Sequence, residues 1–129
     1  MKQKVVKINQ RTTGNSVIGK TAEYKIEIKF VDTRFERAYP KSKTKNLLLY
    51  KWLTTAFYKI AKNPRIGRYV PKNQIPKKYI LKYNIDNMRV YNLPKGWRLF
   101  YSIVQEKIWI IALILEWGTH KQYERMMGH

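Results

Sequence analysis

The residues best suited to chemistry lie in the last third of the chain. Arg98 interrupts the apolar segment GWRLFYSIV, and its planar guanidinium could donate two hydrogen bonds to one phosphate group. His120 is one of only two histidines in the chain, and its imidazole could give or take a proton near neutral pH. We therefore interpret Arg98 as a candidate cation for phosphate chemistry and His120 as a candidate proton carrier.

Other kinds of catalytic site find little support in the sequence. Glu116 is an alternative base, but a structural ion pair is the preferred interpretation of this residue. The sequence shows no paired carboxylates, no His/Asp cluster and no glycine-rich phosphate loop, which disfavours metal-assisted and nucleotide-driven chemistry. Because the chain has no cysteine, disulfides and thiolate metal sites are excluded. We expect no cofactor and no metal.

The charge of the chain indicates a polyanionic partner. It has 27 basic and 8 acidic residues, which gives a net charge of +19, and no acidic residue occurs between Arg37 and Ile85. Such a field attracts RNA, and the ten tyrosines could stack on unpaired bases. We prefer RNA or ribosome binding over a membrane surface or an acidic protein as the explanation. Within the acid-free stretch we expect RNA contacts from Lys77, Lys78 and Lys82.

Length and composition indicate a single domain over residues 1–129. A chain of 129 residues with 44% hydrophobic residues can bury a core. No apolar stretch approaches the ~18 residues needed to cross a bilayer, and the first residues lack the apolar centre of a secretory signal. We expect a cytoplasmic protein with no membrane partner, built from an N-terminal extension (1–22) and a core (23–127).

Hydrophobic periodicity predicts the elements that must position the candidate residues. Segment 4–9 is a candidate strand followed by the loop TTGNS. Segment 23–31 alternates strictly, which is typical of a half-buried strand. The apolar face of that strand should carry Tyr24, Ile26, Ile28 and Phe30.

Two helices are predicted next. Thr33 and Glu36 form a capping box that opens a short helix, which Pro40 should end. The basic segment KSKTK would then be a linker. Apolar residues at helical spacing predict a second helix over about 44–62, ended by an Asn-Pro pair.

The second half of the chain reads as a loop, three strands and a helix. Segment 64–86 is predicted to be an ordered loop, and strands are predicted at 88–93, 96–104 and 107–117. A C-terminal helix should follow, capped by Thr119. These elements predict an α+β fold with an antiparallel sheet and with the helices on one of its faces.

Short pieces of the chain resemble the RelE/ParE superfamily of bacterial and archaeal toxins. They are NPRI (63–66), MRVY (88–91), GWRLFYSI (96–103) and THKQY (119–123), in that order after a first strand. The resemblance implies a RelE-like fold and the toxin of a type II toxin–antitoxin system. It implies an mRNA interferase, a metal-independent endoribonuclease that acts on the ribosome through attack of the ribose 2′-hydroxyl on its phosphate. It also implies a cognate antitoxin, which we expect to cover the sheet with an acidic segment.

The resemblance also implies roles for individual residues. Arg98 corresponds to the arginine that stabilises the phosphorane, and His120 corresponds to the acid/base position after the last strand. Arg89 corresponds to a basic catalytic residue on the neighbouring strand, and Tyr123 to a terminal aromatic. Around these four catalytic candidates, we expect further RNA contacts from Tyr91, Lys95 and Lys121.

Two other functions stay open. A ParE-type toxin, which inhibits gyrase, would share the fold but would not need His120. A non-enzymatic protein that binds RNA or the ribosome would account for the charge without any catalytic residue.

The nuclease interpretation requires several groups to converge on one phosphate. We predict that Arg89, Tyr91 and Arg98 open onto one concave, basic face of the sheet. His120 should lie at the rim of that face. A two-residue turn after Pro94 would place the three residues together, whereas a three-residue loop that includes Pro94 would separate them unless a bulge restores the parity.

Overall fold

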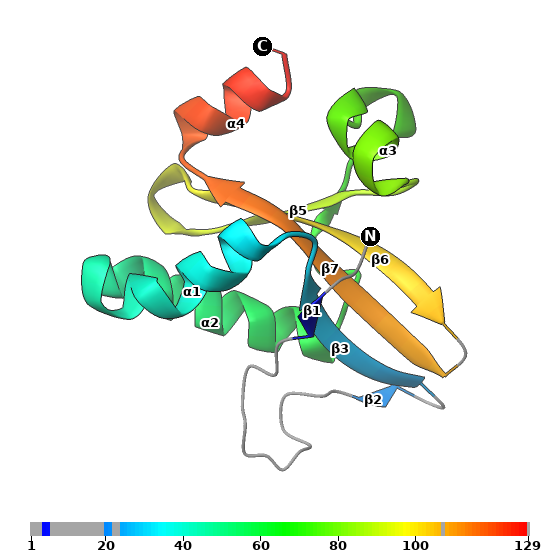
Figure 1. Cartoon of the computed structure of the whole chain (residues 1–129), viewed down its shortest axis with the longest axis horizontal. Helices are drawn as coiled ribbons and strands as arrows, with labels where there is room; N and C mark the ends of the chain where they lie inside the picture. Colours follow the sequence, from blue (N-terminus) through cyan, green and yellow to red (C-terminus); the bar gives the residue numbers. More distant parts are fainter. Residues whose placement is uncertain (1–3, 6–19, 22–23, 107, 129) are drawn as a thin grey trace.

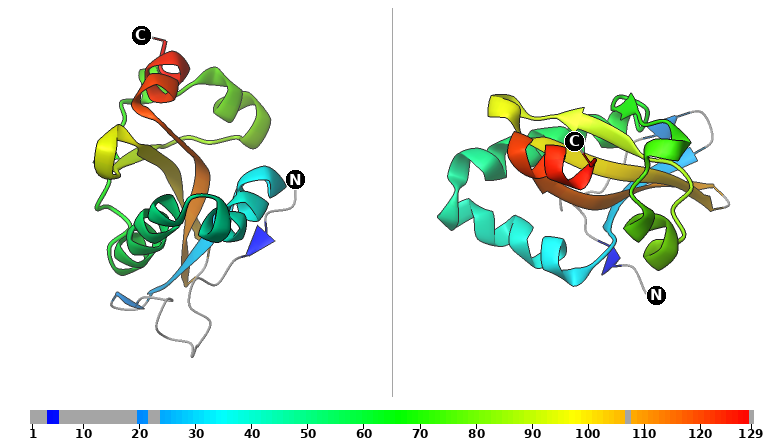
Figure 2. Two further views of the ribbon diagram at one scale, coloured as in Figure 1. Left: turned by 90° about the vertical axis from the view of Figure 1, so that its left-hand side faces the viewer. Right: turned by 90° about the horizontal axis from the view of Figure 1, so that it is seen from above.

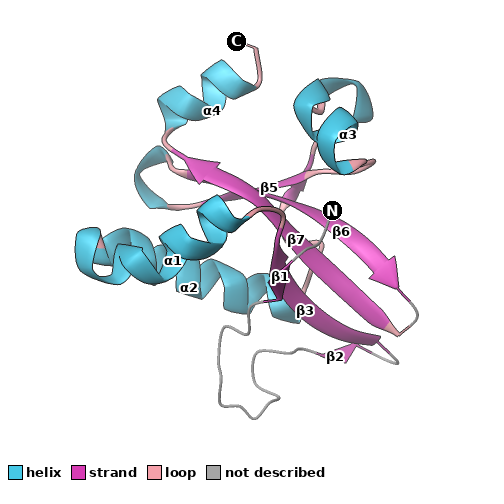
Figure 3. Ribbon diagram, in the orientation of Figure 1, coloured by secondary structure: helices cyan, strands magenta, loops and turns pink. Residues whose placement is uncertain are grey.

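The computed structural model describes residues 4–5, 20–21, 24–106 and 108–128 (Figure 1). Its strands are β1 (Lys4–Val5), β2 (Lys20–Thr21), β3 (Tyr24–Phe30), β4 (Arg68–Tyr69), β5 (Arg89–Asn92), β6 (Arg98–Glu106) and β7 (Trp109–Gly118). They form one sheet in the order β1-β3-β7-β6-β5-β4, with β2 also paired to β3. The fold is α+β, and the predicted order of strand, helical hairpin, three-stranded meander and terminal helix is confirmed (Figure 3).

The sheet is mixed rather than purely antiparallel. β5, β6 and β7 form the predicted antiparallel meander. β3, however, lies parallel to β7, with Ile28 opposite Ala112. Parallel neighbours cannot be joined by a tight turn, and here the intervening helices and the meander make the connection. Of the N-terminal extension, only residues 4–5 and 20–21 are described, so most of the predicted strand at 4–9 and the TTGNS loop lie outside the described residues.

Helices α1 (Thr33–Lys45) and α2 (Leu47–Lys62) lie side by side against one face of the sheet (Figure 2). The alternation of β3 sends its apolar side chains to this face, as predicted for Ile26, Ile28 and Phe30. They share a core cluster with the apolar stripe of α2, formed by Leu49, Leu53, Ala56, Phe57 and Ile60. α2 ends at the Asn-Pro pair, as predicted.

The prediction that Pro40 ends the first helix is wrong. α1 continues through Pro40 to Lys45, and the KSKTK segment forms its last turns instead of a linker. A proline inside a helix costs about 3 kcal/mol. Burial of Tyr39 against Phe30 and Phe57 offsets this cost, because an aromatic side chain contributes a comparable amount when it is buried.

The start of α1 also differs from the prediction. The N-cap is Asp32, whose carboxylate accepts a hydrogen bond from the Phe35 amide at 3.2 Å, and Thr33 is already the first helical residue. A carboxylate at the cap accepts a hydrogen bond from a free backbone N–H, and its negative charge interacts favourably with the positive end of the helix dipole. Asp32 therefore caps the helix in place of the predicted Thr33–Glu36 box.

The other face of the sheet is also covered, so the prediction of helices on one face only is wrong. The segment after α2 is ordered, as expected, but it contains β4, a 3₁₀ turn (Lys72–Gln74) and helix α3 (Lys77–Tyr83). α4 (His120–Met126) follows β7 and is capped by Thr119, as predicted. Both helices lie at the top of Figure 1, away from α1 and α2. They contribute to a second core cluster that includes Ile75, Tyr79, Val90, Phe100 and Leu113, with Tyr123 and Met126 packed against it.

None of the helices in the described part of the chain has the length and hydrophobicity needed to span a membrane.

Candidate functional site

Arg98 lies on the face of the sheet that is opposite α1 and α2. Along β6, Leu99 and Tyr101 belong to the core cluster against these helices, and Trp97 packs at its margin. Phe100 belongs to the second cluster, on the other face. Because side chains alternate along a strand, Arg98 shares the face of Phe100, as predicted. We call this side of the sheet the Arg98 face.

The turn between β5 and β6 decides which residues join Arg98. It is the three-residue loop: the amide of Leu93 donates to the carbonyl of Trp97 at 2.9 Å. Lys95 and Gly96 both have positive φ, at 60° and 80°. The register then pairs Asn92 with Arg98, which is not the register that a two-residue turn would give.

The predicted convergence of Arg89, Tyr91 and Arg98 is therefore wrong. Tyr91 pairs with Leu99 and Arg89 pairs with Tyr101, which places both on the face of α1 and α2. The bulge of the sheet lies between β6 and β7, next to Phe100, and leaves the β5–β6 parity unchanged. Arg89 and Arg98 lie on opposite faces of the sheet and therefore cannot contact one phosphate together.

Arg89 has a structural role instead. Its guanidinium donates to the carbonyls of Arg65, at 3.2 Å, and of Gly67, at 2.7 Å. The hydroxyl of Tyr101 binds the same turn, donating to the Pro64 carbonyl at 2.5 Å and accepting from the Gly67 amide at 2.9 Å. Burial raises the pKa of Tyr101, although the Gly67 amide partly opposes this. Arg89 and Tyr101 therefore hold the turn that leads into β4.

On the Arg98 face, Tyr123 is the centre of a cluster. Its ring is stacked nearly parallel on Phe100, with centroids 5.6 Å apart. The Cζ atom of Arg98 lies 5.4 Å from the Tyr123 centroid, and the His120 ring lies 6.2 Å from it. The terminal nitrogen of Arg68 donates to the Tyr123 hydroxyl at 3.5 Å. We call these residues (Arg68, Arg98, His120 and Tyr123) the Arg98 cluster.

Arg98 has no carboxylate partner within the described residues. Its Nη1 donates to the Trp97 carbonyl at 3.3 Å, and its buried Nε has no hydrogen-bond partner among those residues. The two ion pairs of the described chain involve other cations. Within the part of the chain that the structure describes, Arg98 is therefore not the cationic half of a structural ion pair.

His120 is exposed and is held by its own helix. Its Nε2 lies 3.0 Å from Oε2 of Glu124, one turn later in α4. The capping box of α4 joins Thr119 and Gln122 and fixes the helix start, which places His120 close to Gly96 in the β5–β6 loop. The carboxylate of Glu124 therefore lies next to one of the two ring nitrogens of His120.

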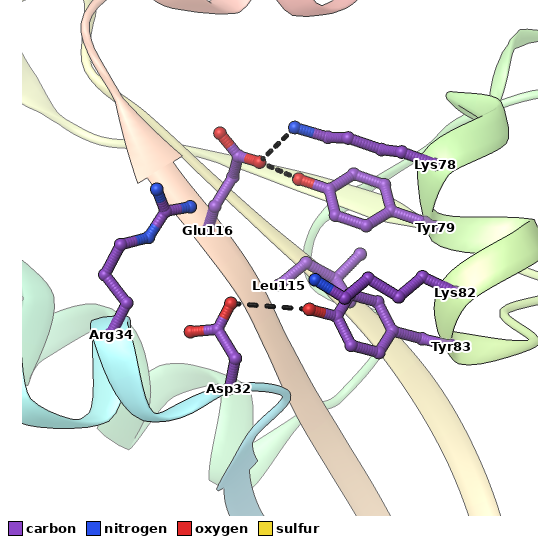
Figure 4. A pocket seen from close by; sticks show the side chains of 8 residues that line it. All are labelled: Asp32, Arg34, Lys78, Tyr79, Lys82, Tyr83, Leu115 and Glu116. Carbon is purple, nitrogen blue, oxygen red and sulfur yellow. Dashed lines mark hydrogen bonds and ion pairs between the residues drawn. The ribbon is translucent and has the colours of Figure 1, made fainter. Parts of the chain in front are cut away.

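Glu116 forms a structural ion pair, as preferred from the sequence. It accepts hydrogen bonds from Lys78, at 3.1 Å, and from the Tyr79 hydroxyl. Burial raises the pKa of Tyr79, and the bond to Glu116 raises it further. These groups line a pocket of about 390 Å³ between α3, β7 and the start of α1 (Figure 4).

A second hydrogen bond in this pocket also holds α3 against the sheet. Asp32 accepts a bond from the Tyr83 hydroxyl at 3.4 Å, opposite the pair formed with Glu116 (Figure 4). Both signs of charge are present, because Arg34 and Lys82 also line the pocket. We interpret it as a polar junction that attaches α3, and the positive charge of Lys78 is compensated there.

The remaining predicted RNA contacts are dispersed. Lys77 is exposed at the start of α3, Lys95 is exposed in the β5–β6 loop, and Lys121 is exposed on α4. Tyr91 lines a separate hollow with Trp52 and Lys59 on the face of α1 and α2. Of these residues, Lys95 and Lys121 are the nearest in sequence to the Arg98 cluster.

Sequence reasoning missed Arg68. It pairs with Val90, a residue of the second core cluster, and this register directs it to the Arg98 face. β4 has only two residues, too few for any alternation to be detected. The only available signal is the position of Arg68 within the acid-free stretch. Among the described residues, no three side chains of the His, Cys, Asp and Glu types come together as a metal site.

Comparisons with protein-family models, with curated proteins and with solved structures give no match for this chain.

Proposed function

We propose that this protein is the toxin of a toxin–antitoxin system, an endoribonuclease that cleaves mRNA on the ribosome without a metal. The observation that carries the proposal is the cluster of Arg98, His120 and Tyr123. These are three of the four residues for which the sequence predicts a catalytic role. They come from β6 and α4 and lie close enough to act on one phosphodiester.

Arg98 suits the role of the transition-state cation. Attack of the 2′-oxygen on phosphorus forms one P–O bond while the bond to the 5′-oxygen breaks, and negative charge accumulates on the phosphoryl oxygens. A guanidinium stabilises such charge best when no carboxylate neutralises it. The half-buried Arg98 meets this condition within the described chain.

His120 suits proton transfer. The reaction needs a base that takes the 2′-proton and an acid that protonates the departing 5′-oxygen. We assign acceptance of the 2′-proton to Nδ1 of His120, the ring nitrogen that does not contact Glu124. Tyr123 carries a hydroxyl within the same cluster, in contact with Arg68. Tyr123 is therefore the candidate acid.

Arg68 replaces Arg89 as the second cation of the proposed site. It contacts the hydroxyl of Tyr123, whereas Arg89 is bound to the turn before β4 on the other face. We assign Arg68 to the phosphate next to the scissile one. The proposed partners are mRNA on the ribosome and an antitoxin whose acidic segment covers the Arg98 cluster.

The test is an mRNA cleavage assay in a translation extract, with the full chain and with single variants. Arg98→Ala and His120→Ala should each lower the cleavage rate by at least ~100-fold. Arg125→Ala removes another exposed cation of α4 and serves as the matched control, with little effect expected.

A non-catalytic protein that binds RNA or the ribosome is the second candidate. It is favoured by the coverage of the Arg98 face, since α3 and α4 occupy much of it. In this case the wild type would leave mRNA intact, and Arg98→Ala would lower the affinity for RNA only by the amount expected for the loss of one positive charge. Equal cleavage by the wild type and both catalytic variants would also overturn the nuclease proposal.

A further inference from the structure

Tyr69 is an exposed aromatic on the edge of the sheet. It belongs to β4, the last strand in the sheet order, and 56% of its surface is accessible. An aromatic side chain of this size usually loses most of its surface to the core or to a partner. The position of Tyr69 on an edge strand leaves its ring open to a ligand that approaches from the side of the sheet.

The ring of Tyr69 is placed beside a fixed cation. Tyr69 is the cross-strand partner of Arg89, and the Cζ atom of Arg89 lies 6.0 Å from the centroid of the ring. Arg89 itself is held by two backbone carbonyls of the preceding turn. The guanidinium therefore cannot move freely, and the attraction between cation and ring gives Tyr69 a preferred position.

The neighbourhood of Tyr69 is basic. Arg65, in the turn before β4, and Arg68, in β4, are both exposed, and no acidic residue occurs in the chain between Arg37 and Ile85. An aromatic ring surrounded by arginines is the combination by which proteins hold single-stranded RNA, with bases on the ring and phosphates on the cations.

β4 joins this surface to the Arg98 cluster. Because consecutive side chains of a strand point to opposite faces, Arg68 reaches Tyr123 on the Arg98 face while Tyr69 projects to the other side of the same edge. An RNA strand that leaves the cluster at Arg68 and passes over the edge meets Tyr69 next.

We infer that Tyr69 is a stacking platform for an unpaired base of RNA, one that follows the phosphate held by Arg68. The inference rests on the proposed function for the position of the scissile phosphate, but binding at Tyr69 does not require cleavage. A protein partner for the same surface is the alternative that the experiment must separate.

The test measures the binding of the full chain to a 2′-O-methyl oligonucleotide, which cannot be cleaved, by fluorescence anisotropy. Tyr69→Ala should raise the dissociation constant by about 5- to 150-fold, the range found when a base loses its aromatic platform. Tyr69→Phe should retain nearly full affinity, since the ring is kept. For a duplex of the same sequence, Tyr69→Ala and the wild type should have the same affinity.

Two further measurements identify the interaction as stacking. The wild type should bind an oligonucleotide with a single abasic site at the stacked position as weakly as Tyr69→Ala binds the intact strand. Tyr69→Ala should bind the abasic and the intact oligonucleotides with the same affinity. The slope of log affinity against log salt should stay unchanged in Tyr69→Ala and fall by about one in Arg68→Ala, because only the second loses a phosphate contact.

The control variant is Leu81→Ala, which removes an 82% exposed apolar side chain from α3. It should bind like the wild type. The inference would be overturned if Tyr69→Ala bound the single strand as tightly as the wild type does, or if it lost affinity equally for the single strand and the duplex. If the wild type binds and depends on Tyr69 but cleaves nothing, the stacking site stands and the nuclease proposal fails.

Discussion

Replacement of Tyr101 by phenylalanine tests how the turn before β4 is held. Tyr101 is fully buried, and its hydroxyl bonds the Pro64 carbonyl and the Gly67 amide, both in buried residues. Tyr101→Phe keeps the ring in the core but leaves these two backbone groups without a partner. Each lost partner costs about 1–3 kcal/mol when the remaining group is buried.

The net loss is smaller than the sum of both costs. The variant no longer buries a hydroxyl, which returns roughly 1–3 kcal/mol. We therefore expect the free energy of unfolding to fall by about 2 kcal/mol. The shift in melting temperature per kcal/mol of lost stability falls as domains become larger. For a domain of this length, the loss corresponds to a melting temperature lower by roughly 6–10 °C.

The assay is urea unfolding followed by tryptophan fluorescence, with thermal unfolding as a second measurement. Tyr69→Phe is the matched control, because it removes a hydroxyl from a tyrosine that is 56% exposed, and we expect a change within ±0.5 kcal/mol. The m-value should be the same for both variants and the wild type. A change below about 0.5 kcal/mol in Tyr101→Phe would show that the two hydrogen bonds do not hold this turn.

Three other predictions concern stability and the attachment of α3. Burial raises the pKa values of Tyr39, Tyr79 and Tyr101. The unfolded tyrosines release protons above about pH 10, so unfolding should be favoured as pH rises beyond that value, by about 1.4 kcal/mol per pH unit for each residue. Alkaline urea titrations should show a shallower pH dependence for Tyr79→Phe; an unchanged slope would contradict the assignment. Gly67→Ala would place a Cβ atom 2.8 Å from the Tyr101 ring and hydroxyl, and should lower the free energy of unfolding by about 1–3 kcal/mol, whereas Gly128→Ala meets no atom within 4 Å and should cost only the strain of a positive φ. Glu116→Gln should speed amide exchange of α3, because it weakens the contacts with Lys78 and Tyr79; Glu106→Gln, at the exposed end of β6, is the control, and equal exchange in both variants would argue against this attachment.

Local patterns predicted most elements because each depends on near neighbours in the sequence. The alternation of β3 identified its buried face, and the apolar residues of α2 at helical spacing identified the helix and its end. The sequence around Pro40 predicts a helix end that does not occur, because the local cost of a proline is outweighed by burial of Tyr39, and burial depends on residues distant in the chain. The sequence predicts a loop at the short β4 and α3 because elements of two and seven residues give little periodicity.

The position of Arg98 opposite the helix-facing side chains of its own strand follows from local sequence, since neighbouring side chains must alternate. The strong positive charge and the lack of thiol chemistry follow from composition. The residues that accompany Arg98, in contrast, depend on tertiary structure. The backbone of Lys95 and Gly96 adopts positive φ in a three-residue loop, and one residue more in a turn moves a whole strand to the opposite parity. The register set by this loop places Arg89 against the turn before β4. Arg68, which comes from a segment without periodicity, lies beside Tyr123 instead.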